Sequence, residues 1–158
     1  MNIVEPIRDR KLILKIELVL AKKSSRNLLL FVFGTNSGLR ISDILALNVS
    51  DVKNKSHIEI EEKKTGKRKK FPINSKLKRL IESFTFGKDN YEPLFLSKKN
   101  NRLSRGQAYK IIHDACREVG ITYNIGTHSL RKSFGYHHYR QYKDVAILQA
   151  ILNIPLQV

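Results

Sequence analysis

Apolar side chains along the chain recur mostly every three or four positions, which is the period of an α-helix. Residues 9–22 show this spacing first, and a Ser-Ser pair then fits a break followed by the N-cap of a second apolar helix over about 26–35. The Asn-Ser-Gly stretch at 36–38 predicts a turn, and Ser42 is placed to cap a short helix over 43–47. The first third of the chain is therefore predicted to hold three helices.

The apolar period changes from about four to two in the middle of the chain. Residues 57–61 alternate between apolar and polar and predict a strand, and residues 70–73 predict a strand that returns beside it. The Lys-Thr-Gly-Lys stretch at 64–67 is a plausible turn between the two strands. One antiparallel β-hairpin is therefore expected.

Helical spacing returns after the hairpin. The further predicted segments are a helix over 75–84, an extended stretch over 93–97, a helix from a Ser104 cap to Val119 that Gly120 ends, a connector over 121–127, and helices over 129–142 and 144–152. The predicted fold class is mainly α with a small antiparallel β-hairpin or sheet. A chain of 158 residues is expected to form a single domain over 1–158 with a sizeable core.

The charge balance points to a polyanionic partner. The chain has 30 Lys and Arg against 14 Asp and Glu, a formal net charge of +16. The predicted hairpin concentrates six of the cations within eight residues; they are Lys63, Lys64, Lys67, Arg68, Lys69 and Lys70. Nucleic acid is the partner that such a pattern favours, and the alternative is a solvated face of a basic protein.

Other classes of protein fit the sequence less well. The longest stretch without Asp, Glu, Lys or Arg in the first half covers 13 residues, 27–39, whereas a membrane span needs about 20 apolar ones. No helix combines a basic face with Trp or Phe anchors for a membrane surface. The single cysteine, Cys116, excludes an internal disulfide framework and a multi-cysteine zinc site, so we expect a reducing cytoplasm and no metal.

Three separated motifs together carry more information than the charge does. They are Ser-Gly-Leu-Arg-Ile-Ser-Asp-Ile-Leu at 37–45, Lys-Lys-Thr-Gly-Lys at 63–67 with Pro72 eight positions after Lys64, and Thr-His-Ser-Leu-Arg-Lys-Ser-Phe at 127–134. In this order and at these separations they resemble the catalytic domain of the tyrosine recombinases, the phage integrase family. The resemblance covers about residues 6–153 and implies the DNA breaking–rejoining fold of that domain.

The resemblance implies a phosphate-binding pair in Arg40 and Arg131. Guanidinium groups offer planar, paired donors that stay protonated, which suits the charge that phosphoryl transfer builds on the non-bridging oxygens. Without the resemblance, each arginine has an alternative interpretation. Arg40 could form a salt bridge with Asp43, and Arg131 could be a solvated helix residue.

The resemblance also implies two residues that move protons. Lys64 matches the general acid that protonates the leaving 5′ oxygen, with Lys63 and Lys67 as rivals and simple backbone binding as the alternative. His128 lies three residues before Arg131, on the same helix face, and matches the residue that transfers a proton near the nucleophile. Its alternative is a helix-start histidine bonded to the backbone. The residues expected to bind the DNA backbone are Lys63, Lys67, Arg68, Lys69, Lys70 and Lys132.

The sequence departs from the family pattern near its end. The family places a second His or Trp after a Leu-Asn or Leu-Gly step, but Ile154 follows Leu152-Asn153 here. The nucleophilic tyrosine is expected about nine residues further on, past Val158. We therefore expect a truncated domain that lacks this tyrosine and the N-terminal core-binding domain and is inactive alone. The six tyrosines present are interpreted as core or surface aromatics.

The implied function is site-specific cutting and rejoining of double-stranded DNA through a 3′-phosphotyrosyl link in the intact enzyme, without a cofactor. It would serve integration, excision or resolution of phage or mobile DNA. We expect a homo-tetramer on DNA for the intact enzyme and a monomer for this chain. The alternative is a non-catalytic nucleic-acid-binding module that uses the same basic surface.

Overall fold

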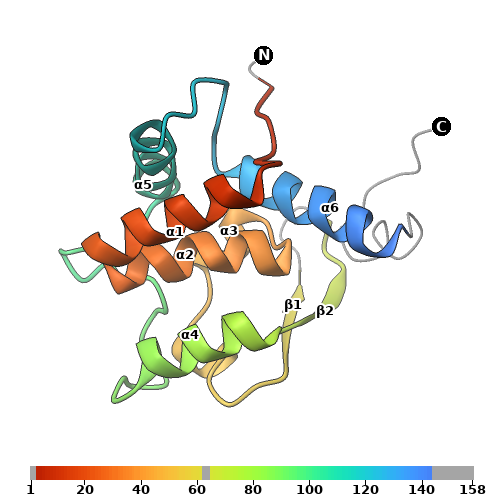
Figure 1. Cartoon of the computed structure of the whole chain (residues 1–158). Coiled ribbons are helices and arrows are strands. Elements are labelled where there is room, and N and C mark those ends of the chain that lie inside the picture. The colour runs from red at the N-terminus through yellow and green to blue at the C-terminus, as the bar shows by residue number, and fades with distance from the viewer. Residues whose placement is uncertain (1–2, 62–64, 144–158) are drawn as a thin grey trace.

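The computed structural model describes residues 3–61 and 65–143 (Figure 1). Its elements, in chain order, are α1 (Arg10–Lys23), α2 (Ser25–Ser37), α3 (Ile41–Leu45), a 3-10 turn (Val49–Asp51), β1 (His57–Glu61), β2 (Arg68–Pro72), α4 (Ser75–Thr85), α5 (Arg105–Glu118) and α6 (His128–Tyr142). The mainly α fold with one small antiparallel sheet is confirmed. The helix predicted over 144–152 lies outside the described residues.

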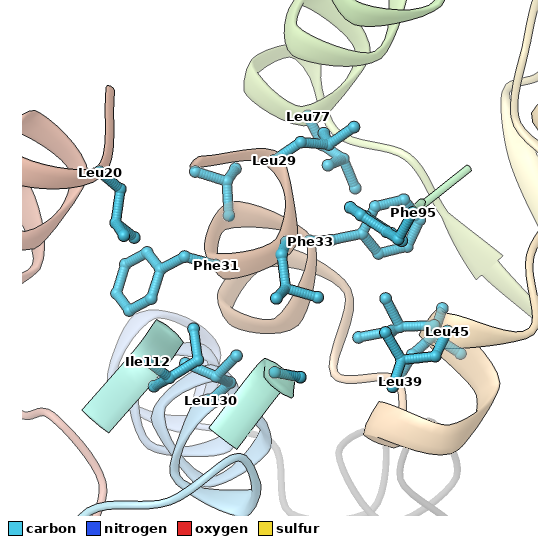
Figure 2. Close-up of a cluster of buried hydrophobic side chains, with 14 of the residues drawn as sticks. Leu20, Leu29, Phe31, Phe33, Leu39, Leu45, Leu77, Phe95, Ile112 and Leu130 are labelled. Atoms are coloured by element: carbon cyan, nitrogen blue, oxygen red, sulfur yellow. The ribbon is translucent and has the colours of Figure 1, made fainter. Parts of the chain in front are cut away.

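Helix α2 is the centre of the fold. It packs against α1, α4 and α6 and also touches α3 and α5. Residues 29–34 are buried around the whole helix circumference, as expected for a helix enclosed by other elements. Figure 2 shows Phe31 directed toward Leu20 of α1 and Ile112 of α5, while Phe33 meets Phe95 edge to face with ring centroids 6.2 Å apart. One helix therefore fixes elements on several sides.

Side-chain caps set the helix boundaries largely where the sequence predicts them. Ser24 ends α1 and begins α2, and its Oγ accepts a hydrogen bond from the backbone N–H of Asn27 at 3.2 Å. Ser104 and Gln107 form a reciprocal capping box at the start of α5, as the predicted Ser104 cap requires. Gly120 follows α5 with φ = 92°, a conformation that favours glycine.

Two predicted boundaries differ from the structure near residue 40. Helix α2 continues through Ser37, so the predicted turn is confined to Gly38, where φ is 73°. The next helix begins at Ile41 rather than Asp43, because the Arg40 carbonyl accepts the N–H groups of Asp43 and Ile44. Arg40, and not Ser42, therefore occupies the N-cap position of α3.

The stretch predicted to be extended over 93–97 forms no named strand. It makes isolated bridges instead, at Asn48 with Pro93 and at Leu96 with Arg102. The first bridge connects the loop after α4 to the segment that follows α3, and the second closes a turn within that loop.

The pleat of the hairpin separates its residues onto two faces. Ile58 lies opposite Phe71, and both are fully buried, so a register slip by one residue would expose this apolar pair. Ile60 lies opposite Lys69 on the same inner face. Glu59 and Lys70 form an ion pair at 3.5 Å on the outer face. No helix in the described part of the chain is long and apolar enough to cross a membrane.

Candidate active site

Arg40 is positioned by the turn that joins α2 to α3. Gly38 reverses the chain in the left-handed conformation, and Leu39, 2% exposed, anchors the turn in the core. The Ser37 Oγ donates to the carbonyl of Phe33 at 2.6 Å and accepts from the N–H of Leu39 at 3.2 Å. These contacts leave Arg40 half-buried at the start of α3.

Arg102 holds the other end of α3. Its guanidinium donates to the carbonyl oxygens of Leu45 at 3.2 Å and Leu47 at 3.0 Å, and it also donates to the side chain of Asn48. Free carbonyl groups at a helix end need such partners. The short helix that carries Arg40 is thus fixed at both ends.

Arg131 is positioned by the first turns of α6. The Ser133 Oγ donates to the Ser129 carbonyl at 2.6 Å and accepts from the N–H of Ile7 at 2.8 Å. Leu130 packs so closely against Gly34 of α2 that a Cβ on that glycine would lie 2.6 Å from Leu130 Cδ1. Arg131 itself is 5% exposed, so its interpretation as a solvated helix residue is wrong.

Arg40, His128 and Arg131 line one cavity of about 490 Å³. The residues that complete its lining are Ile41, Ser42, Arg105 and Thr127. The structure therefore brings together three of the four residues that the sequence predicts to be catalytic. His128 is exposed at the first position of α6, three residues before Arg131.

Arg105 is the cavity residue that the sequence analysis missed. It is the first residue of α5 and follows the Ser104 cap. The cap is readable from the sequence, but an arginine just after a cap looks like any solvated helix residue. Only the packing of α5 beside α3 shows that this arginine shares a cavity with Arg40 and Arg131.

The cavity concentrates positive charge. Burial, and after it the nearby charge of Arg40, lower the pKa of Arg131 to about 10, while the charge of Asp43 acts in the opposite direction. Arg131 still carries its proton near neutral pH. Asp43 is 3% exposed, so the cavity has a buried carboxylate beside it that opposes part of the charge. Cations gathered in this way favour a bound anion.

The described hairpin cations differ in their relation to this cavity. Lys67, Arg68 and Lys70 are exposed, whereas Lys69 is half-buried. The pKa of Lys69 is lowered by burial and then by the charges of Lys67, Arg131 and Arg40. Lys69 therefore lies within electrostatic reach of both arginines. Lys63 and the predicted general acid Lys64 lie outside the described residues.

Other predicted or candidate residues lie elsewhere. Lys132 is half-buried and donates from Nζ to the Val4 carbonyl at 2.9 Å, so its contact with DNA stays a prediction. All six tyrosines belong to the described part of the chain, and none of them lines the cavity. Tyr142 lines a separate cavity beside α1, and the Tyr136 ring lies under the guanidinium groups of Arg8 and Arg140. Within residues 3–61 and 65–143, no three His, Cys, Asp or Glu side chains gather as metal ligands.

Sequence comparison finds relatives that are named as integrases or recombinases. The model of the phage integrase family matches residues 10–153. "Probable integrase/recombinase YoeC" of Bacillus subtilis strain 168 is 47% identical over 154 residues, which cover 97% of this chain and 84% of that protein. "Tyrosine recombinase XerA" of Pyrococcus horikoshii is 33% identical over 130 residues, which cover 79% of this chain and 44% of that protein.

Structure comparison finds the same fold in solved proteins. The crystal structure of XerA recombinase superposes with a TM-score of 0.82 at 19% identity, over 98% of this chain and 58% of that chain. A lambda integrase dimer bound to a COC′ core site gives a TM-score of 0.79 at 17% identity, over 99% of this chain and 60% of that chain. This chain thus spans under two thirds of either solved protein.

Proposed function

The chain belongs to the phage integrase family, and from that membership we propose that it supplies the catalytic domain of a site-specific DNA recombinase. The observation that carries the proposal is the shared cavity of Arg40, His128 and Arg131. Arg40 lies 88 positions before His128 and further still before Arg131, yet two helix starts bring the three residues together. A simple DNA-binding module needs no such cluster, and the relatives are named recombinases.

Arg40 and Arg131 bind the scissile phosphate in this proposal. Their guanidinium groups donate to the two non-bridging oxygens, and they stabilise the charge that grows there as the phosphate is attacked. Burial excludes water around Arg131, which strengthens these interactions. His128, an exposed residue that lines the same cavity, transfers a proton near the attacking tyrosine.

Lys64 is the proposed proton donor to the leaving 5′ oxygen. The attacking tyrosine forms a 3′-phosphotyrosyl bond as the bond from phosphorus to the 5′ oxygen breaks. The covalent link keeps the energy of the phosphodiester, so the reverse step rejoins the strand without ATP. None of the six tyrosines of this chain is proposed as the nucleophile, since none lines the cavity.

The proposed partner is double-stranded DNA in the cytoplasm. The solved relatives include lambda integrase bound to a core site and a lambda integrase tetramer bound to a Holliday junction. The net charge of +16 supports an equivalent polyanionic partner for this chain. We expect the intact recombinase to act as a tetramer on DNA and this chain alone to be a monomer, which light scattering would test.

The arginine pair is tested by covalent trapping of a nicked duplex, in a form of the protein that carries the family's nucleophilic tyrosine. Arg40→Ala and Arg131→Ala should each lower the rate of covalent protein–DNA complex formation at least about 10²-fold, because each removes a donor to the transition state. The control is Arg79→Ala, an exposed arginine of α4 that does not line the cavity.

The same variants separate recombination from simple binding. If duplex affinity changes little while trapping is lost, the arginines act on the reacting phosphate. Trapping at the unchanged rate in Arg40→Ala and Arg131→Ala would refute their assignment.

A further inference from the structure

We propose that Arg105 binds a second DNA phosphate, the one that neighbours the scissile phosphate on the same strand. The inference rests on the proposed function of the cavity and assigns a residue that the motifs do not include. Arg105 enters the cavity from α5, whereas Arg40 enters from α3 and Arg131 from α6. Three guanidinium groups therefore face one cavity from three separate helices.

A single phosphodiester is too small an anion for three arginines. It carries one negative charge, and its two non-bridging oxygens are already matched by the donors of Arg40 and Arg131. Those two guanidinium groups repel one another, since Arg40 lowers the pKa of Arg131. A third guanidinium on the same phosphate would add repulsion with no further negative charge to offset it, whereas a second phosphate supplies another charge and more acceptor oxygens.

The cavity has room for more than one phosphate. Its volume of about 490 Å³ falls in the range that drug-sized ligands occupy. Ser42 and Thr127 add hydroxyl groups to the lining, which can donate to phosphate or sugar oxygens. A sugar–phosphate unit beyond the scissile phosphate fits this size and this polarity.

The start of α5 holds Arg105 in a fixed place. The capping box of Ser104 and Gln107 sets the first turn of the helix, and Leu103 and Ala108 on either side are buried. The N–H of Leu103 donates to the carbonyl of Phe95 at 3.0 Å, which ties the helix start to the core. The backbone at Arg105 is therefore fixed, and its exposed side chain starts from a defined position beside the cavity.

The test measures how binding of this chain to random-sequence duplexes depends on salt. Arg105→Gln should lower the magnitude of the slope of log K against log salt by about 0.9, which is the value for one lost phosphate contact. It should weaken binding equally on duplexes of different sequence, because a phosphate carries no sequence information. Arg105→Lys keeps the charge and should keep the slope.

The matched control is Arg79→Gln, which removes an exposed arginine outside the cavity and should leave the slope unchanged. An unchanged slope for Arg105→Gln would overturn the inference. A loss of affinity confined to certain DNA sequences would also overturn it, because it would indicate that Arg105 contacts a base. If the unchanged protein itself binds duplex DNA without salt dependence, the proposed function fails first.

Discussion

At the scale of single residues, the pleat of β2 places the neighbouring lysines Lys69 and Lys70 on opposite faces of the hairpin. Lys69 shares the inner face of the sheet with Ile58, Ile60 and Phe71, and its pKa is lowered by burial and by the cations around it. Lys70 points to the outer face and pairs with Glu59 at 3.5 Å. DNA phosphates near Lys69 would relieve the repulsion and raise its pKa again.

This difference predicts that DNA binding takes up protons through Lys69. As pH rises through the lowered pKa of Lys69, the free protein loses a proton that the complex retains, so affinity falls with increasing pH. Lys69→Met should reduce this fall over the alkaline range below the ordinary lysine pKa, and Lys70→Met should not. The measurement is the duplex dissociation constant across that range at constant ionic strength. Equal pH dependence in Lys69→Met and the unchanged protein would contradict the prediction.

At the scale of elements, the contact of α2 with α6 places the second arginine. A Cβ on Gly34 would lie 2.6 Å from Cδ1 and 2.7 Å from Cβ of Leu130, and Arg131 is the next residue. The Leu130 Cβ belongs to the helix frame and cannot move aside by rotating a side chain. The small residue in α2 therefore lets α6 approach, and it fixes the depth of the Arg131 guanidinium.

Gly34→Ala should destabilise the fold by about 1–3 kcal/mol, the usual cost of overpacking. The matched control is Gly106→Ala in α5, where the added Cβ meets only Ser104 Oγ at 4.0 Å and should stabilise by up to about 1 kcal/mol. Urea unfolding of both variants measures whether each substitution lowers or raises the free energy of unfolding. A stabilising effect of Gly34→Ala would mean that α6 is free to shift.

The sequence predicts these elements better than it predicts their contacts. The serines that cap α2 and α5 are readable because capping is a local interaction between a side chain and the next turn. The start of α3 differs from the prediction because Arg40, two residues after Gly38, takes the N-cap position and its carbonyl accepts the first helical N–H groups. Arg105 needs the packing of α5 beside α3, which no local pattern contains.

At the scale of the whole molecule, the site is an assembly of distant segments around α2. The helix start at Arg40, the start of α5 and the start of α6 converge on one cavity, and β2 brings Lys69 within electrostatic reach. The motifs predict Arg40, His128 and Arg131 as one group because a family resemblance carries spatial information that a single chain's periodicity lacks. The packed core keeps these like charges together despite their mutual repulsion.

Because the fold holds the cations of the cavity close together, we predict that a small anion stabilises the folded protein. Inorganic phosphate binds the cavity only when the chain is folded, so at ten times its dissociation constant it should add about 1.4 kcal/mol to the free energy of unfolding. For a chain of this size, that corresponds to a rise in Tm of about 3–6 °C. The comparison is sodium chloride at the same ionic strength, since salt also screens the net charge of +16. Arg40→Gln should remove the difference between phosphate and chloride and keep the general effect of salt. A phosphate effect of equal size in Arg40→Gln would mean that the anion stabilises the basic surface as a whole rather than this cavity.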